Sequence, residues 1–145
     1  MYYIESNDER IDLDLVKKDL DAFLSYLGEK RDFSLSFITD EEIQSLNREY
    51  RDIDSPTDIL TFALTDGEQF PVMDEEDEEM GDIFISIDSM ERNAKEFNVT
   101  PEEELKRLLL HGLLHLRGLD HKTNDFSTEP MLIEQERILR ELAII

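Results

Sequence analysis

The order of apolar and polar positions along the chain predicts a mixture of helices and strands. We expect a helix where apolar residues recur every three or four positions, and a strand where they alternate with polar residues. Helical spacing is found at residues 11–27, 39–50, 89–97, from Thr100 to the turn at Gly118, and after Pro130. Strand patterns are found at residues 2–4, 33–37, 59–64 and 82–87.

Capping residues support two of the helix starts. Thr39 and Glu42 are spaced as a capping box, in which each side chain bonds the other residue's backbone N–H. Thr100 is a typical N-cap, Pro101 suits the first helical position, and Glu103 stands in register for a second box. No internal repeat or linker interrupts the 145 residues, so we expect one domain over residues 1–145. The pattern predicts an α+β fold, a small mixed β-sheet of about four strands packed with about five helices.

Composition restricts the partners and the compartment. The chain carries 37 acidic residues against 15 Lys and Arg, a formal net charge of -22. Such acidity opposes binding to polyanions, so a nucleic-acid function must rest on a local basic or metal-bearing cleft. Acidic residues are dense in the segment 66–82, which we expect to form a mobile loop. The absence of cysteine, of a signal-peptide pattern and of a membrane-span-length apolar run fits a cytoplasmic protein.

The run from His111 to His121 contains all three histidines of the chain. His111 and His115 are four residues apart, so they lie one turn apart on the same face of a helix. Gly118 can adopt the left-handed conformation that ends a helix, after which the chain can bring His121 back to the same point. Three neutral imidazoles around one cation leave a fourth position for water, as in catalytic zinc sites. We therefore predict one metal ion on the predicted C-terminal-half helix, most simply Zn²⁺, although imidazole also suits other transition metals.

The histidine spacing matches the metzincin peptidase signature H-E-x-x-H-x-x-G-x-x-H, except that Gly112 replaces the glutamate. That glutamate is the general base of the peptidases. A metzincin-like zinc peptidase is therefore one interpretation, which Gly112 disfavours. A nonenzymatic interaction protein with a structural metal is another. The open fourth position disfavours it, because four protein ligands usually close a structural zinc site.

The segment from His111 to His121 also resembles the signature of the YbeY family of rRNA maturation endoribonucleases. Two further segments agree with that family in order and spacing, residues 46–62 and residues 81–86. The resemblance implies a metal-dependent endoribonuclease specific for single-stranded RNA, with zinc held by the three histidines. It further implies action on the 16S rRNA precursor in 3′-end maturation and in ribosome quality control, with the ribosome or a ribosomal protein as partner.

The resemblance also implies a catalytic arginine at Arg51. A guanidinium offers two parallel donors to phosphoryl oxygens that gain negative charge during cleavage. Asp120 precedes a histidine, and either orients a ligand or accepts a proton, or is simply a turn residue after Gly118. Asp58 and Asp82 are weaker candidates of the same kind. Further cations that could contact phosphates are Arg48, Lys106, Arg107, Arg117 and Lys122.

Overall fold

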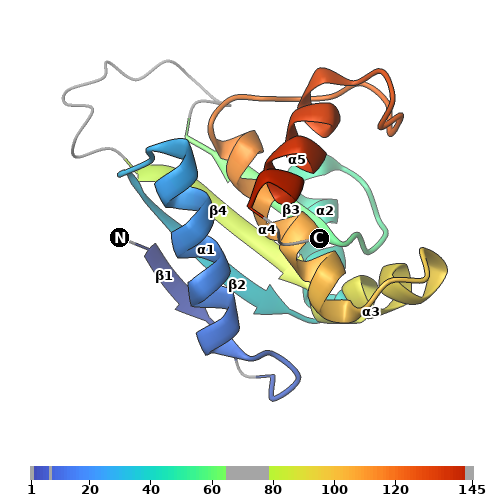
Figure 1. Ribbon diagram of the computed structural model, residues 1–145. Coiled ribbons are helices and arrows are strands. Elements are labelled where there is room, and N and C mark those ends of the chain that lie inside the picture. Colours follow the sequence, from blue (N-terminus) through green and yellow to red (C-terminus); the bar gives the residue numbers. More distant parts are fainter. Residues whose placement is uncertain (1, 7, 65–78, 143–145) are drawn as a thin grey trace.

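The computed structural model describes residues 2–6, 8–64 and 79–142. Its strands are β1 (Tyr2–Glu5), β2 (Asp32–Ile38), β3 (Ile59–Ala63) and β4 (Glu79–Ser86). Its helices are α1 (Leu13–Leu27), α2 (Asp40–Arg51), α3 (Ile87–Glu96), α4 (Pro101–Leu116) and α5 (Pro130–Glu141). This α+β architecture of the described residues confirms the fold class predicted from the sequence (Figure 1).

The four strands form one mixed sheet in the order β1-β2-β4-β3. Strands β1, β2 and β4 run parallel, whereas β3 pairs antiparallel with β4 at one edge. The alternating pattern of β2 corresponds to alternating burial, because Phe33, Leu35 and Phe37 are buried and their neighbours in the strand are not. The antiparallel strand β3 makes the sheet mixed. It also lies next to α4, the helix that carries two of the histidines.

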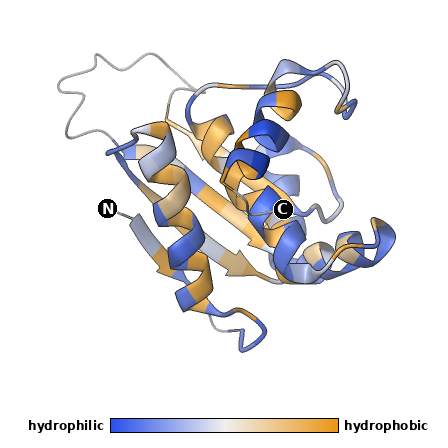
Figure 2. Ribbon diagram, in the orientation of Figure 1, coloured by the Kyte–Doolittle hydropathy of each residue, from blue (hydrophilic) through white to orange (hydrophobic). Residues whose placement is uncertain are grey.

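Helices cover both faces of the sheet. Figure 1 shows α1 and α4 across one face, α5 stacked over α4, and α2 on the opposite face. On the α4 face, Ile59 and Ile83 approach the backbone of α4. On the other face, the ring of Phe62 contacts Tyr50 of α2 and Phe84 of β4. Apolar residues gather on the central strands and on α4 (Figure 2). Helix α4, which carries two of the histidines, contacts both the sheet and α5 and therefore lies between them.

Several element boundaries differ from the predicted ones. Strand β4 begins at Glu79, earlier than expected, and it ends at Ser86 because the Ser86 hydroxyl caps α3 by accepting the Ser89 N–H at 3.2 Å. Ile87 is therefore the first residue of α3 rather than the last of a strand. Helix α1 begins at Leu13 because the Asp12 carboxylate accepts two backbone N–H groups of the first turn. The expected mobile acidic loop falls largely on residues 65–78, outside the described residues.

Candidate metal centre and adjoining cleft

Helix α4 starts and stops where its sequence dictates. The Thr100 hydroxyl accepts the Glu103 N–H at 3.1 Å, and Pro101 occupies the first turn. The second half of the predicted capping box is not observed, because the Glu103 carboxylate pairs with Arg107 at 2.7 Å instead. At the other end, Gly118 takes a φ of 97° and so supplies the sharp turn expected after the helix.

The structure brings the three histidines together. His111 and His115 project from adjacent turns of α4, and their Nε2 atoms lie 3.1 Å apart. The ring of His121, which follows the turn, lies with its centroid 5.1 Å from that of His111 and 5.5 Å from that of His115. One nitrogen from each ring falls within 4.8 Å of the others, and no other such group of metal-ligand side chains occurs in the described ranges. Each ring is partly buried.

The nitrogens on the outer side of the rings face oxygen atoms. His111 Nδ1 lies 2.8 Å from Oε1 of Gln135 on α5, and His121 Nδ1 lies 2.7 Å from the Thr123 carbonyl oxygen. An Nδ1–H donated to either oxygen leaves the Nε2 lone pair for a cation, which is how metal-binding histidines are usually oriented. The donor set therefore fits a transition metal such as zinc.

The structure places Asp120 in the turn that leads to His121. Its carboxylate accepts the His121 backbone N–H at 2.8 Å, as a turn residue does. The same oxygen lies 3.9 Å from His115 Nδ1, which is too far for a direct hydrogen bond. The Asp120 side chain is 84% exposed. Its local contact is thus with the turn, and His115 is the histidine that it faces.

The surroundings of His111 keep its imidazole neutral. Burial lowers the pKa of His111 to about 4, the neighbouring His115 and His121 rings act in the same direction, and the bond to Gln135 opposes them. A neutral imidazole is the form that binds a metal. In neutral solution His111 therefore needs no deprotonation before it can act as a ligand.

Gly112 has a packing role that the sequence did not reveal. A Cβ atom built at this position would lie 3.0 Å from Ile83 Cδ1 and 3.1 Å from Ile59 Cδ1. The position that carries glutamate in the peptidases is thus occupied here by a close approach of α4 to the sheet. A glutamate side chain at residue 112 would be forced into that apolar contact.

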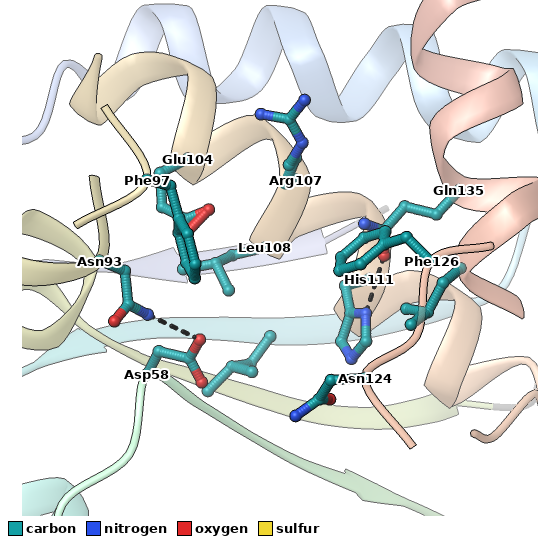
Figure 3. A pocket seen from close by; sticks show the side chains of 12 residues that line it. Asp58, Asn93, Phe97, Glu104, Arg107, Leu108, His111, Asn124, Phe126 and Gln135 are labelled. Atoms are coloured by element: carbon teal, nitrogen blue, oxygen red, sulfur yellow. Dashed lines mark hydrogen bonds between the residues drawn. The ribbon is translucent and has the colours of Figure 1, made fainter. Parts of the chain in front are cut away.

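A cleft of about 420 Å³ begins at His111 (Figure 3). Its walls come from the start of β3, from α3 and α4, and from α5 with the segment before it. Sequence reasoning named only three of its lining residues as candidates, namely Asp58, Arg107 and His111. It missed Asn93, Phe97, Glu104, Phe126 and Gln135. For Glu104 a signal existed, because an acidic residue two turns before His111 lies on the same helix face.

Arg51 lies outside the cleft. It ends α2, its Nη2 donates to the Thr61 carbonyl oxygen at 2.6 Å, and its guanidinium carbon lies 5.1 Å from the centre of the Phe62 ring. It is not among the described residues that line the cleft. Its helix covers the face of the sheet opposite α4, and it reaches the backbone of the edge strand β3 from that side.

The other predicted charged candidates are dispersed. Asp58 lines the cleft. Asp82 is exposed on β4, bonds Ser34, and lies on the α2 face of the sheet with Phe84. Arg48 pairs with Asp54, and Arg117 pairs with Glu29. Lys106 lies close enough to lower the pKa of Asp19, which burial raises. Arg107 is the one predicted cation among the described residues that line the cleft.

The fold and the site define a small α+β protein with a three-histidine centre of the type that holds a metal in hydrolases. None of its described helices has both the length and the apolar composition of a membrane span. The profile of the family described as Endoribonuclease YbeY matches residues 2–143, and the chain belongs to this family. Membership supports an endoribonuclease role.

Individual relatives agree. The chain is 50% identical over 109 residues to the endoribonuclease YbeY of Treponema denticola, a match that covers 75% of this chain and 70% of that protein. It is 46% identical over 114 residues to the protein of the same name from Borrelia duttonii, covering 77% and 74%. The solution structure of TM1509 from Thermotoga maritima superimposes with a TM-score of 0.64 at 31% identity, covering 98% of this chain and 89% of the other.

Proposed function

We propose that this protein is a zinc-dependent endoribonuclease that cuts single-stranded RNA. Its place is 16S rRNA 3′-end maturation and ribosome quality control in the cytoplasm, with the ribosome or a ribosomal protein as partner. The observation that carries the metal dependence is the convergence of three imidazoles whose outer nitrogens face Gln135, Thr123 and Asp120. The net charge of -22 is the reason for including a partner, because the overall field repels free RNA.

The histidines would hold the ion, and residues around them would keep the ligands oriented. A zinc ion held there would supply Lewis acidity and would lower the pKa of a bound water to near 7. Gln135 fixes His111, and the Thr123 carbonyl fixes His121. Asp120 is exposed and faces His115, so we assign it the orientation of that ring and the acceptance of a proton from water.

Arg51 is assigned to the phosphate. In the structure its guanidinium makes one hydrogen bond to a neutral carbonyl and one contact with an aromatic ring, on an exposed side chain. Both contacts are weaker than a bidentate bond to a phosphate. RNA that passes along the β3 edge can therefore draw Arg51 away from Thr61, and the guanidinium then stabilises the charge that develops on the phosphoryl oxygens.

The test is cleavage of one RNA presented as a single strand and as a duplex, by zinc-loaded wild-type protein and by His115→Ala. We expect the wild type to cut only the single strand, and His115→Ala and chelator-treated wild type to cut neither. Glu102→Gln, an exposed change on the same helix, serves as the control and should cleave normally. Cleavage by His115→Ala at the wild-type rate would refute the proposal. Digestion of casein by the wild type alone would favour the peptidase, which the packing at Gly112 opposes.

A further inference from the structure

The cleft beside the histidines contains a carboxylate that accepts no hydrogen bond from the described residues. Glu104 is 6% exposed and lies on α4, two turns before His111. Among the described residues none donates a hydrogen bond to it, and the nearby Arg107 is engaged with Glu103 and Glu136 instead. No fully buried side-chain nitrogen or oxygen atom of the described residues lacks a hydrogen-bond partner, so the Glu104 carboxylate must open onto the cleft that it lines. An acceptor that has no protein donor and opens onto a cleft is available to a ligand with hydrogen-bond donors.

A second carboxylate lies at the same end of the cleft. Asp58 precedes β3, and its Oδ2 accepts the side-chain N–H of Asn93 on α3 at 3.0 Å. Figure 3 shows Asp58 and Glu104 both pointing into this end, while His111 marks the other. Their closeness is also evident from their titration, because Asp58 contributes to the raised pKa of Glu104. This end of the cleft is thus rich in acceptors, and one of its two carboxylates is already held in place.

Two aromatic rings complete the lining. Phe97, at the end of α3, is 62% exposed, and Phe126, in the segment before α5, is 51% exposed. Aromatic rings beside hydrogen-bond acceptors suit unstacked nucleobases, which stack on aromatic faces while their polar edges are read by hydrogen bonds.

We propose that this cleft binds a guanine base of the RNA substrate, with the Glu104 carboxylate accepting hydrogen bonds from the guanine N1–H and N2–H groups. This inference rests on the proposed endoribonuclease function and names its base preference. Phe97 and Phe126 provide stacking surfaces, and Asp58 lies beside Glu104 as a second acceptor. The base would occupy the end of the cleft opposite His111, so guanine recognition fixes where the RNA lies relative to the metal centre.

Guanine is favoured over the other bases by the geometry of a carboxylate. A carboxylate presents two adjacent acceptors. Guanine alone among the four standard bases presents two adjacent donors on its Watson–Crick edge. Adenine and cytosine place an acceptor beside the donor, and uracil places its donor between two carbonyls, so each would set a lone pair against Glu104. A divalent cation is disfavoured, because Asp58 and Glu104 have no third ligand that would make them a metal-binding group among the described residues.

The first experiment measures cleavage by the zinc-loaded protein. Uridine-rich single-stranded RNAs carry one guanosine, inosine, adenosine or cytidine at the same position. We expect cuts at a fixed distance from guanosine, with kcat/KM roughly tenfold or more above adenosine, since a good bidentate pair discriminates by about that factor or more. Inosine, which lacks the N2 amino group, should lose part of the preference. The loss should appear mainly in KM.

Variants test whether Glu104 is the source of the guanosine preference. Glu104→Gln keeps the size of the side chain but replaces one acceptor by a donor, so it should cut guanosine-containing and adenosine-containing RNA at similar rates. Glu102→Gln, an exposed change on the same helix, should keep the wild-type preference. Thermal unfolding establishes that both variants are folded. A guanosine preference that survives in folded Glu104→Gln would overturn the proposal, as would a wild type with no base preference.

A binding measurement separates this inference from the proposed function. Calorimetry with GMP, AMP, CMP and UMP requires no cleavage, and the four ligands share the same phosphate. Wild type and Glu102→Gln should bind GMP roughly tenfold tighter than the other three, and Glu104→Gln should not. If the protein binds GMP selectively but cuts no RNA, the proposed endoribonuclease function is wrong and the proposed guanine site stands. Equal binding of all four nucleotides, or displacement of GMP by Mg²⁺ or Mn²⁺ acting at Glu104, would refute the base site.

Discussion

His111 on α4 and Gln135 on α5 are joined by a contact of 2.8 Å between Nδ1 and Oε1. Gln135 is 2% exposed, so its amide is fixed by packing and in turn fixes the plane of the imidazole. The contact turns the Nε2 atom of His111 toward His115 and ties the metal centre to the last helix. The two helices are also joined by the ion pair between Arg107 and Glu136, and the centre depends on this docking of α5.

Replacement of Gln135 should therefore weaken metal binding without removing a ligand. We expect Gln135→Leu to remain folded and to bind zinc roughly 10- to 100-fold more weakly, the usual effect of losing a hydrogen bond to a ligating histidine. Competition with a chromogenic chelator measures the affinity. The control is Gln44→Leu, at a partly buried glutamine on α2 whose side-chain amide donates to Asp54 far from the histidines. Unchanged affinity in Gln135→Leu would show that His111 is oriented by other contacts.

Each histidine should be needed for metal retention. We expect one zinc per chain in wild type, and a loss of retention in His111→Ala, His115→Ala and His121→Ala. Occupancy should also fall in mild acid, as protons compete for imidazoles near their ordinary pKa of about 6.5. The lowered pKa of His111 means that its competition with protons begins at a lower pH than that of an ordinary histidine. Metal analysis after dialysis from pH 8 to pH 5 tests this, and retention by all three variants would exclude the site.

Substitutions of Gly112 should lower the stability of the fold. Gly112→Ala gains helix propensity but places a methyl group against Ile83 and Ile59, so we expect a loss of stability of up to about 2 kcal/mol. Gly112→Glu, which restores the peptidase signature, forces a charge into an apolar contact and should cost more than about 3 kcal/mol. Urea unfolding measures both changes. A stable Gly112→Glu protein would show that α4 can move away from the sheet, and its peptidase activity could then be assayed.

Arg51 should affect turnover rather than folding. We expect Arg51→Ala to keep its metal and its circular dichroism but to cleave single-stranded RNA about a hundredfold or more slowly, with Arg51→Lys only partly restored, because lysine lacks the bidentate fork. Single-turnover cleavage measures the rate. Arg48→Ala, at an exposed arginine on the same helix, is the matched control. A wild-type rate in Arg51→Ala would leave Arg51 as a helix-end cation on the α2 face of the sheet.

Local patterns explain which features were predictable. The capping residues at Thr39 and Thr100, the alternation in β2 and the histidine spacing on α4 all act over a few residues, so the sequence alone was enough to predict them. Because His111 and His115 are four residues apart, helix geometry alone places both predicted ligands on one face of the helix. The return of His121 needed only the turn at Gly118, which the structure provides.

Features that depend on tertiary contacts were not predictable in this way. Gln135 meets His111 only because α5 docks on α4. Gly112 was interpreted as a missing base, whereas its contact with Ile59 and Ile83 depends on the close approach of helix and sheet. Asp58 was only a weaker candidate in the sequence, and it becomes part of the cleft because the packing of α3 places Asn93 against it.

Glu104 should make stability depend on pH in a direction opposite to that of an ordinary ion-paired carboxylate. Burial raises its pKa to about 7, Asp58 adds to the effect, and Arg107 opposes it. In the unfolded chain the carboxyl group returns to its ordinary value of 4.5. Between these two values the folded protein binds more protons than the unfolded chain, so this contribution to stability is full below pH 4.5 and is lost as pH rises through 7.

The measurement is urea unfolding of metal-free wild type and Glu104→Gln at pH values from 5 to 8. The lowered pKa of His111 makes stability rise with pH up to about 6.5, but this affects both proteins and cancels in their difference. We expect the wild type to lose on the order of 1 to 3 kcal/mol relative to Glu104→Gln across this range. Glu102→Gln, whose side chain is exposed, should run parallel to wild type. If Glu104→Gln also runs parallel to wild type, Glu104 is already ionised in the folded protein, and a donor must be satisfying its carboxylate in solution.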